Sequence, residues 1–98
     1  MVREIGGHGV GVEFHEEPWV GYNTKRGEEM LLVPGLMFTI EPMVNMGSRE
    51  IVFERDGWTV RTRDRKPAAH FEFAVAITKD GPDVLTDFGV IEKALNNN

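Results

Sequence analysis

LMFTIEPMV at residues 36–44 and HFEFAVAIT at residues 70–78 decide how this chain folds. In both stretches apolar side chains recur at every second position, which is typical of a β-strand. One face of the first stretch carries Leu36, Phe38, Ile40 and Val44, and the other carries Met37, Thr39, Glu41 and Met43. One face of the second carries Phe71, Phe73, Val75 and Ile77, and the other carries Glu72, Ala74, Ala76 and Thr78. We therefore predict two strands, each with one acid among apolar or small neighbours.

Further out from these stretches, the chain continues to favour short strands. WTVRTRD at residues 58–64 alternates apolar and basic side chains, which predicts a strand with one wet face. The turn sequence KDGP at residues 79–82 precedes a short strand at residues 84–86, which predicts a hairpin. Residues 90–95 favour one or two helical turns. The expected fold class is therefore α+β, a mostly antiparallel sheet with very little helix.

Composition limits the possible functions. The 98 residues form at most one domain, with 41% hydrophobic residues, 28% charged residues and a net charge of −5. This charge argues against a nucleic-acid surface, and the one basic cluster, at residues 61–66, is expected to be a solvated strand edge. No apolar run approaches the roughly 18 residues that span a bilayer. Nothing directs secretion, so a cytoplasmic location without nucleic acid or membrane partners is expected.

Glu41 and Glu72 are the first candidates for chemistry. An acid within an apolar strand is costly unless it is paired, hydrogen-bonded or bound to a metal. Each acid alone could pair with an arginine or accept backbone hydrogen bonds. Two such acids together with His8, which lies in the glycine-rich stretch GGHGVG at residues 6–11, favour a metal site. The chain has no cysteine, so any metal must bind histidine and carboxylates.

His15 follows His8 by seven residues. If both lie on one extended strand, their rings point to opposite faces, or to the same face where a bulge intervenes. His15 could then line the site without binding the same ion. The alternative is that His15 is merely an exposed histidine before the acidic pair at residues 16–17. Trp58, judged without further context, is expected to be a core anchor.

Four segments of the chain contain recognisable motifs: GGHGVGVEFHEEP (6–18), LLVPGLMFTIEPMV (31–44), DGWTVRTRD (56–64) and HFEFAVAIT (70–78). They resemble the successive motifs of the bacterial-type methionine aminopeptidases. The resemblance covers residues 3–86 in the order and spacing of that family. The GHG and TIEP elements are also similar to those of prolidase and aminopeptidase P, whereas FHEEP, FTIEPMV and DGWTV are closer to methionine aminopeptidase.

This resemblance implies a fold, an activity and a site. The fold is the C-terminal half of the pita-bread fold. The activity is removal of the N-terminal methionine from nascent peptides, a step of protein maturation, by water activated on divalent metals. A complete site of the family holds two metal ions, which could be cobalt, manganese, iron or zinc. The implied metal ligands are His8, Glu41 and Glu72; the implied catalytic residues are His15 and Glu41; the implied substrate-binding residues are Phe14, His15 and Trp58.

The chain also departs from the family pattern. The family's two aspartate ligands lie upstream of the GHG motif, so residues 1–98 are expected to be the C-terminal part of a catalytic domain whose N-terminal half is absent. None of the aspartates present matches those positions: Asp56, Asp64, Asp80, Asp83 and Asp87. Near Glu72, His70 replaces the family's glutamine and Phe73 its histidine. His70 is a weak candidate for an extra ligand.

Two classes of function therefore stay open. The first is a metalloaminopeptidase that acts on N-terminal methionyl peptides, here an incomplete fragment with weak or no activity. The second is a non-catalytic peptide-binding module or pseudoenzyme derived from the same fold. The expected protein partner is either the missing N-terminal half or a second copy. A homodimer would bring the acids of the two copies together, and divalent metal would strengthen it.

Overall fold

The structure is a computed structural model that describes residues 1–22, 24–27 and 30–97. The elements are β1 (Gly7–Gly9), β2 (Glu16–Val20), β3 (Met37–Ile40), β4 (Met43–Asn45), β5 (Ile51–Phe53), β6 (Val60–Thr62), β7 (Ala68–His70), β8 (Phe73–Thr78), β9 (Gly81–Val84) and the helix α1 (Gly89–Asn96). Residues 24–27 and 30, between β2 and β3, are exposed.

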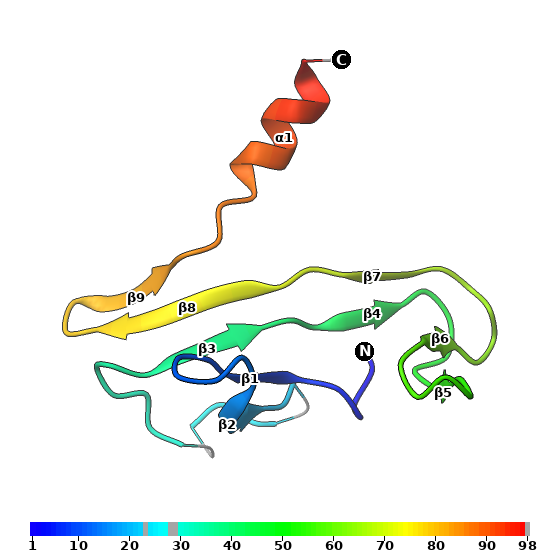
Figure 1. Ribbon diagram of the computed structural model, residues 1–98, viewed down its shortest axis with the longest axis horizontal. Helices are drawn as coiled ribbons and strands as arrows, with labels where there is room; N and C mark the ends of the chain where they lie inside the picture. The colour runs from blue at the N-terminus through cyan, green and yellow to red at the C-terminus, as the bar shows by residue number, and fades with distance from the viewer. Residues whose placement is uncertain (23, 28–29, 98) are drawn as a thin grey trace.

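The strands form one larger sheet and two small ones (Figure 1). The larger sheet has the order β2-β1-β3-β8-β9, and every neighbouring pair in it is antiparallel. β4 pairs with β7, and β5 pairs with β6, again antiparallel. The predicted fold class, a mostly antiparallel sheet with very little helix, is confirmed.

Residues 36–44 and residues 70–78 are each divided between two strands. The first stretch becomes β3 and β4, and the second contributes to β7 and β8. In the ladder Ile40 lies opposite Phe73 and Met43 lies opposite His70. The two predicted strands are therefore not continuous, because the first is interrupted in its middle and the second near its start. Pro42 has no N–H to donate, so the ladder cannot continue through it. Residues 41–42 and 71–72 lie in this interruption.

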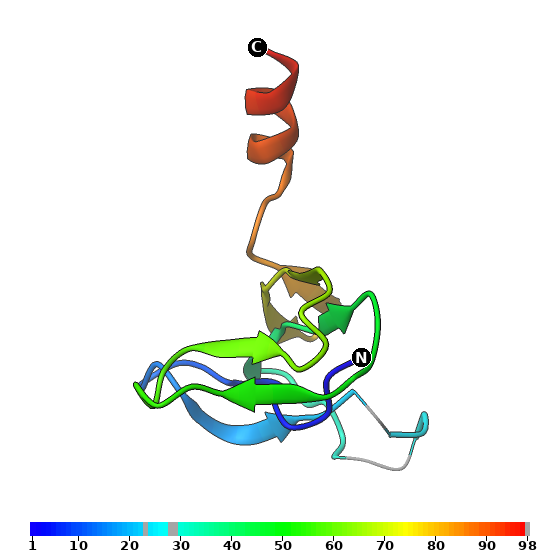
Figure 2. The same ribbon diagram turned by 90° about the vertical axis from the view of Figure 1, so that its right-hand side faces the viewer.

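The remaining elements follow the predictions with shifted bounds. The strand predicted at residues 58–64 is only β6, and the sequence pattern did not indicate its partner β5. The hairpin after β8 is present, but β9 begins at Gly81, so two of the residues predicted as the turn belong to the strand. The helical tail is confirmed as α1. It stands apart from the sheets in both views (Figure 2), and none of its described residues is buried.

The hydrophobic core is small. Its buried apolar side chains are Val2, Phe38 and Val75, and the last two are direct partners across β3 and β8. Many large apolar side chains stay exposed, Trp58 the most among the aromatic ones at 89%. The expectation of Trp58 as a core anchor is therefore wrong. Among the described residues, no helix is long and apolar enough to cross a membrane.

Candidate metal centre

His8, Glu41 and Glu72 meet at the interruption of the ladder. His8 is the middle residue of β1, Glu41 follows β3 directly, and Glu72 directly precedes β8. Because β1, β3 and β8 are neighbours in the sheet, the three side chains converge. His8 Nε2 lies 3.6 Å from Glu41 Oε2 and 3.6 Å from Glu72 Oε1. One nitrogen and two carboxylate oxygens lie within 4.8 Å of one another, an arrangement that could hold a metal ion.

The glycines on either side of His8 allow this approach. A Cβ on Gly7 would overlap the carbonyl oxygen of Thr39, and a Cβ on Gly9 would overlap the carbonyl oxygen of Glu17. β1 is thus pressed between β2 and β3 with no room for side chains at these two positions. The two glycines of the GHG motif therefore allow the close strand packing that brings His8 to the acids.

Thr39 links the histidine to the first acid. Its hydroxyl accepts the backbone N–H of His8 at 3.0 Å and donates to Glu41 Oε2 at 3.2 Å. On the ring of His8, Nδ1 lies 3.0 Å from the carbonyl oxygen of Gly9. The carbonyl can only accept, so Nδ1 donates its N–H to it, and Nε2 is the ring nitrogen that faces the acids. That is the orientation a metal ligand requires.

The electrostatics of the cluster favour a cation. Burial, followed by hydrogen bonding with Glu72 and repulsion from it, raises the pKa of Glu41 to about 7, although His8 and Thr39 oppose the shift. With a second carboxylate beside it, Glu41 keeps its proton to a higher pH than usual. A divalent ion in place of that proton would neutralise both charges. The donor set of imidazole and carboxylates therefore fits a divalent metal such as those of hydrolases.

His15 and Phe14 lie beside the cluster, in the loop that joins β1 to β2. The ring centroids of His8 and His15 are 4.3 Å apart, and those of His15 and Phe14 are 4.5 Å apart. His8 and His15 do not share one extended strand, because the chain reverses between them and a bulge lies at Gly9. Both His15 and Phe14 are exposed, so they are accessible to a ligand.

Other predicted candidates lie elsewhere. Trp58 is in the turn between β5 and β6, and the aromatic contacts of the described residues include Phe14 but not Trp58. His70 ends β7 and is not in the three-residue cluster. Asp56 and Asp64 accept hydrogen bonds from nearby side chains or N–H groups, which lower their pKa values. These two aspartates therefore have local structural partners.

Two contributors were missed by sequence reasoning. Thr39 could have been found, because period two places it on the face of Glu41. Tyr22 accepts the backbone N–H of Glu41 through its hydroxyl, and nothing in its sequence context pointed to this contact. Burial raises the pKa of Tyr22.

A histidine on one strand and two acids at the ends of neighbouring antiparallel strands form the kind of centre that metallopeptidases use. The sequence pattern of metallopeptidase family M24 matches residues 1–79, and this chain belongs to that family. It is 49% identical over 86 residues to the methionine aminopeptidase of Escherichia coli strain K12. That alignment covers 88% of this chain and 33% of the relative, so the chain spans about a third of the length of the curated relatives it matches.

Solved structures of methionine aminopeptidases share the fold. The enzyme from Rickettsia prowazekii superimposes with a TM-score of 0.81 at 40% identity, over 85% of this chain and 34% of that one. The enzyme from Thermotoga maritima gives a TM-score of 0.82 at 41% identity, over 88% of this chain and 34% of that one. The resemblance to bacterial methionine aminopeptidases, and to part of their fold, is confirmed.

Proposed function

We propose that this chain carries part of the active site of a metalloaminopeptidase that removes the N-terminal methionine from nascent peptides. The observation that carries the proposal is the convergence of His8, Glu41 and Glu72 from three neighbouring segments. Similarity to named methionine aminopeptidases supplies the substrate class. Cytoplasmic location stays a prediction that follows from this function.

His8, Glu41 and Glu72 would hold the divalent metal, which is cobalt, manganese, iron or zinc, with two ions in a complete site. When bound, the metal supplies Lewis acidity and lowers the pKa of water that attacks the peptide carbonyl. Glu41 would also accept and return a proton of the attacking water, the role that the family resemblance implies for it. Thr39 keeps one oxygen of that carboxylate oriented.

His15 and Phe14 would contact the substrate. His15 is exposed next to His8, where its ring N–H can donate to the oxygen of the scissile peptide as negative charge develops. Phe14 packs edge-on against His15 and offers an apolar wall for a methionine side chain, since sulfur makes favourable contacts with aromatic rings. Trp58 is the second proposed wall, on the exposed turn of the β5–β6 hairpin.

The cluster supplies three ligands, fewer than a two-metal site requires. We therefore propose that further ligands come from polypeptide beyond these residues, either the remaining part of a longer chain or a second copy. By this reasoning the 98 residues alone bind divalent metal weakly and release methionine only at background rate. The alternative function, a non-catalytic peptide-binding module or pseudoenzyme, would need no ligand set, so the three converged ligands favour the enzyme.

Complementation tests this function. The 98-residue chain is mixed with the upstream two thirds of the Escherichia coli relative and manganese or cobalt, and methionine release from a methionyl peptide is measured. We expect release above that of either piece alone, and its loss in His8→Ala. A Thr78→Val chain, changed far along β8, is the matched control and should behave as the unchanged chain does.

The outcomes separate the two functions. Peptide binding without release in every combination, with or without metal, would favour the non-catalytic module. Strong release by the 98 residues alone, lost in His8→Ala, would support the enzyme and contradict the need for further ligands. The predicted homodimer is checked in the same samples by light scattering with manganese and with a chelator.

A further inference from the structure

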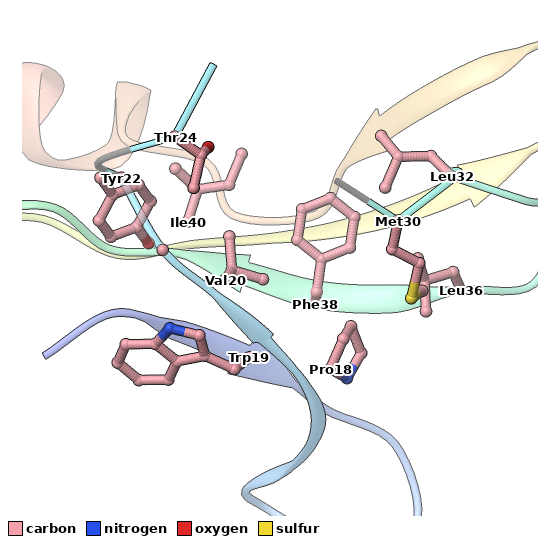
Figure 3. Close-up of a pocket in the computed structure, with 11 residues that line it drawn as sticks. Pro18, Trp19, Val20, Tyr22, Thr24, Met30, Leu32, Leu36, Phe38 and Ile40 are labelled. Carbon is pink, nitrogen blue, oxygen red and sulfur yellow. The ribbon is translucent and has the colours of Figure 1, made fainter. Parts of the chain in front are cut away.

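Tyr22 reaches the cluster from the opposite face of the sheet. Thr39 and Glu41 face His8, whereas the alternate residues Phe38 and Ile40 face an apolar cavity of about 530 Å³ on the other side. Tyr22 lines that cavity, and Figure 3 shows its ring beside Ile40. Its side chain thus begins among apolar neighbours, while its hydroxyl ends at the backbone that carries a proposed metal ligand.

The hydroxyl of Tyr22 lies where β1 and the end of β3 come together. It accepts the backbone N–H of Glu41, the first N–H beyond the last residue of β3. The same oxygen would lie 2.8 Å from a Cβ placed on Gly7, the neighbour of His8. Pro42 follows and has no N–H, so the Tyr22 contact is the last backbone anchor of this segment before β4 begins at Met43.

Glu41 is buried, so its N–H needs a protein partner. The ladder cannot provide one, because Ile40 is the last residue of β3 that is paired with β8. Thr39 holds the carboxylate of Glu41, but it does not fix the backbone from which that side chain extends. The hydroxyl of Tyr22 is the partner that accepts this N–H and fixes the backbone.

We propose that Tyr22 is a positioning residue, which fixes the backbone of Glu41 so that its carboxylate stays in the ligand cluster. This role rests on the proposed metal-binding function. A purely structural role, in which the ring only fills the apolar cavity, would be kept by phenylalanine. A positioning role through the hydroxyl would be lost. Tyr22→Phe therefore separates the two roles with the removal of one oxygen atom.

The first readout needs no metal. Amide hydrogen exchange is followed residue by residue in the unchanged chain and in Tyr22→Phe. We expect the amide of Glu41 to be protected in the unchanged chain, although it lies outside a strand, and to exchange at least about 10-fold faster in the variant. The amides of β8 and β9 should change little. Thr78→Val, which removes a hydroxyl that bonds the carbonyl of Gly81, is the control and should leave the Glu41 amide unchanged.

The second readout uses cobalt alone as the probe. Titration followed by visible absorption should show about 10-fold weaker binding and an altered cobalt spectrum in Tyr22→Phe, as is usual when a group that orients a ligand is removed. Thr78→Val should bind as the unchanged chain does. If cobalt binds neither the unchanged chain nor its mixture with the upstream two thirds of the Escherichia coli relative, the proposed function fails, while the exchange result still decides whether Tyr22 holds Glu41.

Two results would overturn the role of Tyr22. One is a folded Tyr22→Phe chain with unchanged Glu41 exchange and unchanged cobalt binding. The other result can be obtained even if the variant does not fold. If the amide of Glu41 exchanges without protection in the unchanged chain, the hydroxyl of Tyr22 does not hold that amide.

Discussion

The glutamates in two regions of this molecule have different kinds of partner. In the β5–β6 hairpin each of two acids faces an arginine: Glu54 pairs with Arg61, and Glu50 lies 3.5 Å from Arg63. In the ligand cluster, Glu41 and Glu72 face each other, with His8 as their partner. Each hairpin acid has a permanently charged arginine of its own, whereas the two cluster acids share a single histidine.

The difference shows which of the two regions lowers the stability of the fold. Exposed ion pairs of the hairpin kind contribute little, typically about 0.2 to 1 kcal/mol. The cluster instead crowds two carboxylates, one of them buried, and without a cation this opposes folding. A chain with so small a core has little stability to spare. The cluster is therefore best explained by a ligand that supplies positive charge.

The largest expected effect is on metal affinity. Glu72→Gln removes one charged ligand, so we expect manganese or cobalt affinity to fall by at least about 100-fold. This is more than the loss typical when a group that only orients a ligand is removed. Isothermal titration measures it. Glu54→Gln makes the same chemical change in the hairpin and should leave the affinity within about twofold, a change too small to reflect a lost ligand. Equal losses in both variants would erase the distinction between the two regions.

The next effect concerns stability at pH 7 without metal. Glu41→Gln relieves the burial of charge and the repulsion from Glu72, so the free energy of unfolding should rise by about 1 to 3 kcal/mol. Glu54→Gln should lower it by up to about 1 kcal/mol, because it loses an ion pair. Urea unfolding in the presence of a chelator measures both variants. Shifts of stability in the same direction would show that the two acids do not differ in this way.

The pH dependence of stability has the same origin. The pKa of Glu41 is raised from its ordinary 4.5 to about 7 in the folded chain, so folding takes up a proton between these values. The resulting stabilisation is complete below about pH 4.5 and is lost as the pH rises through about 7. We therefore expect the urea midpoint of the metal-free chain to fall between about pH 5 and about pH 7.5, measured in steps. A chain with Glu41→Gln should lack this fall, and an identical slope in it would assign the titration to another group.

The smallest effect is expected at the outer ion pair of the hairpin. The side chains of Arg63 and Glu50 are 69% and 58% exposed, so water and salt screen their attraction. Glu50→Gln should change the free energy of unfolding by less than about 0.5 kcal/mol, and added salt should remove the change. A loss of stability as large as that expected for a buried ion pair would show that the charges of the hairpin are not screened in this way.

Part of the site was predictable from local rules. An acid inside an apolar strand is anomalous wherever the strand lies, so Glu41 and Glu72 could be singled out without a structure. Pro42 could also have signalled the break between β3 and β4, because it cannot donate to a ladder. The reversal between His8 and His15 and the reach of Tyr22 depend on which strands become neighbours. That is decided by pairing between residues far apart in the sequence, which a local pattern does not contain.

Manganese-induced broadening of amide signals in a nitrogen–proton correlation spectrum is the sharpest test of the proposed ligand cluster. A paramagnetic ion broadens the signals nearest to it, so it reports where the metal binds in the unchanged chain. We predict that substoichiometric manganese broadens the amides of His8, Glu41 and Glu72 first, and that Glu72→Gln prevents this. Broadening that starts at the exposed acids Glu17, Asp80 or Asp83, with the cluster unaffected, would contradict the assignment of these three residues as metal ligands.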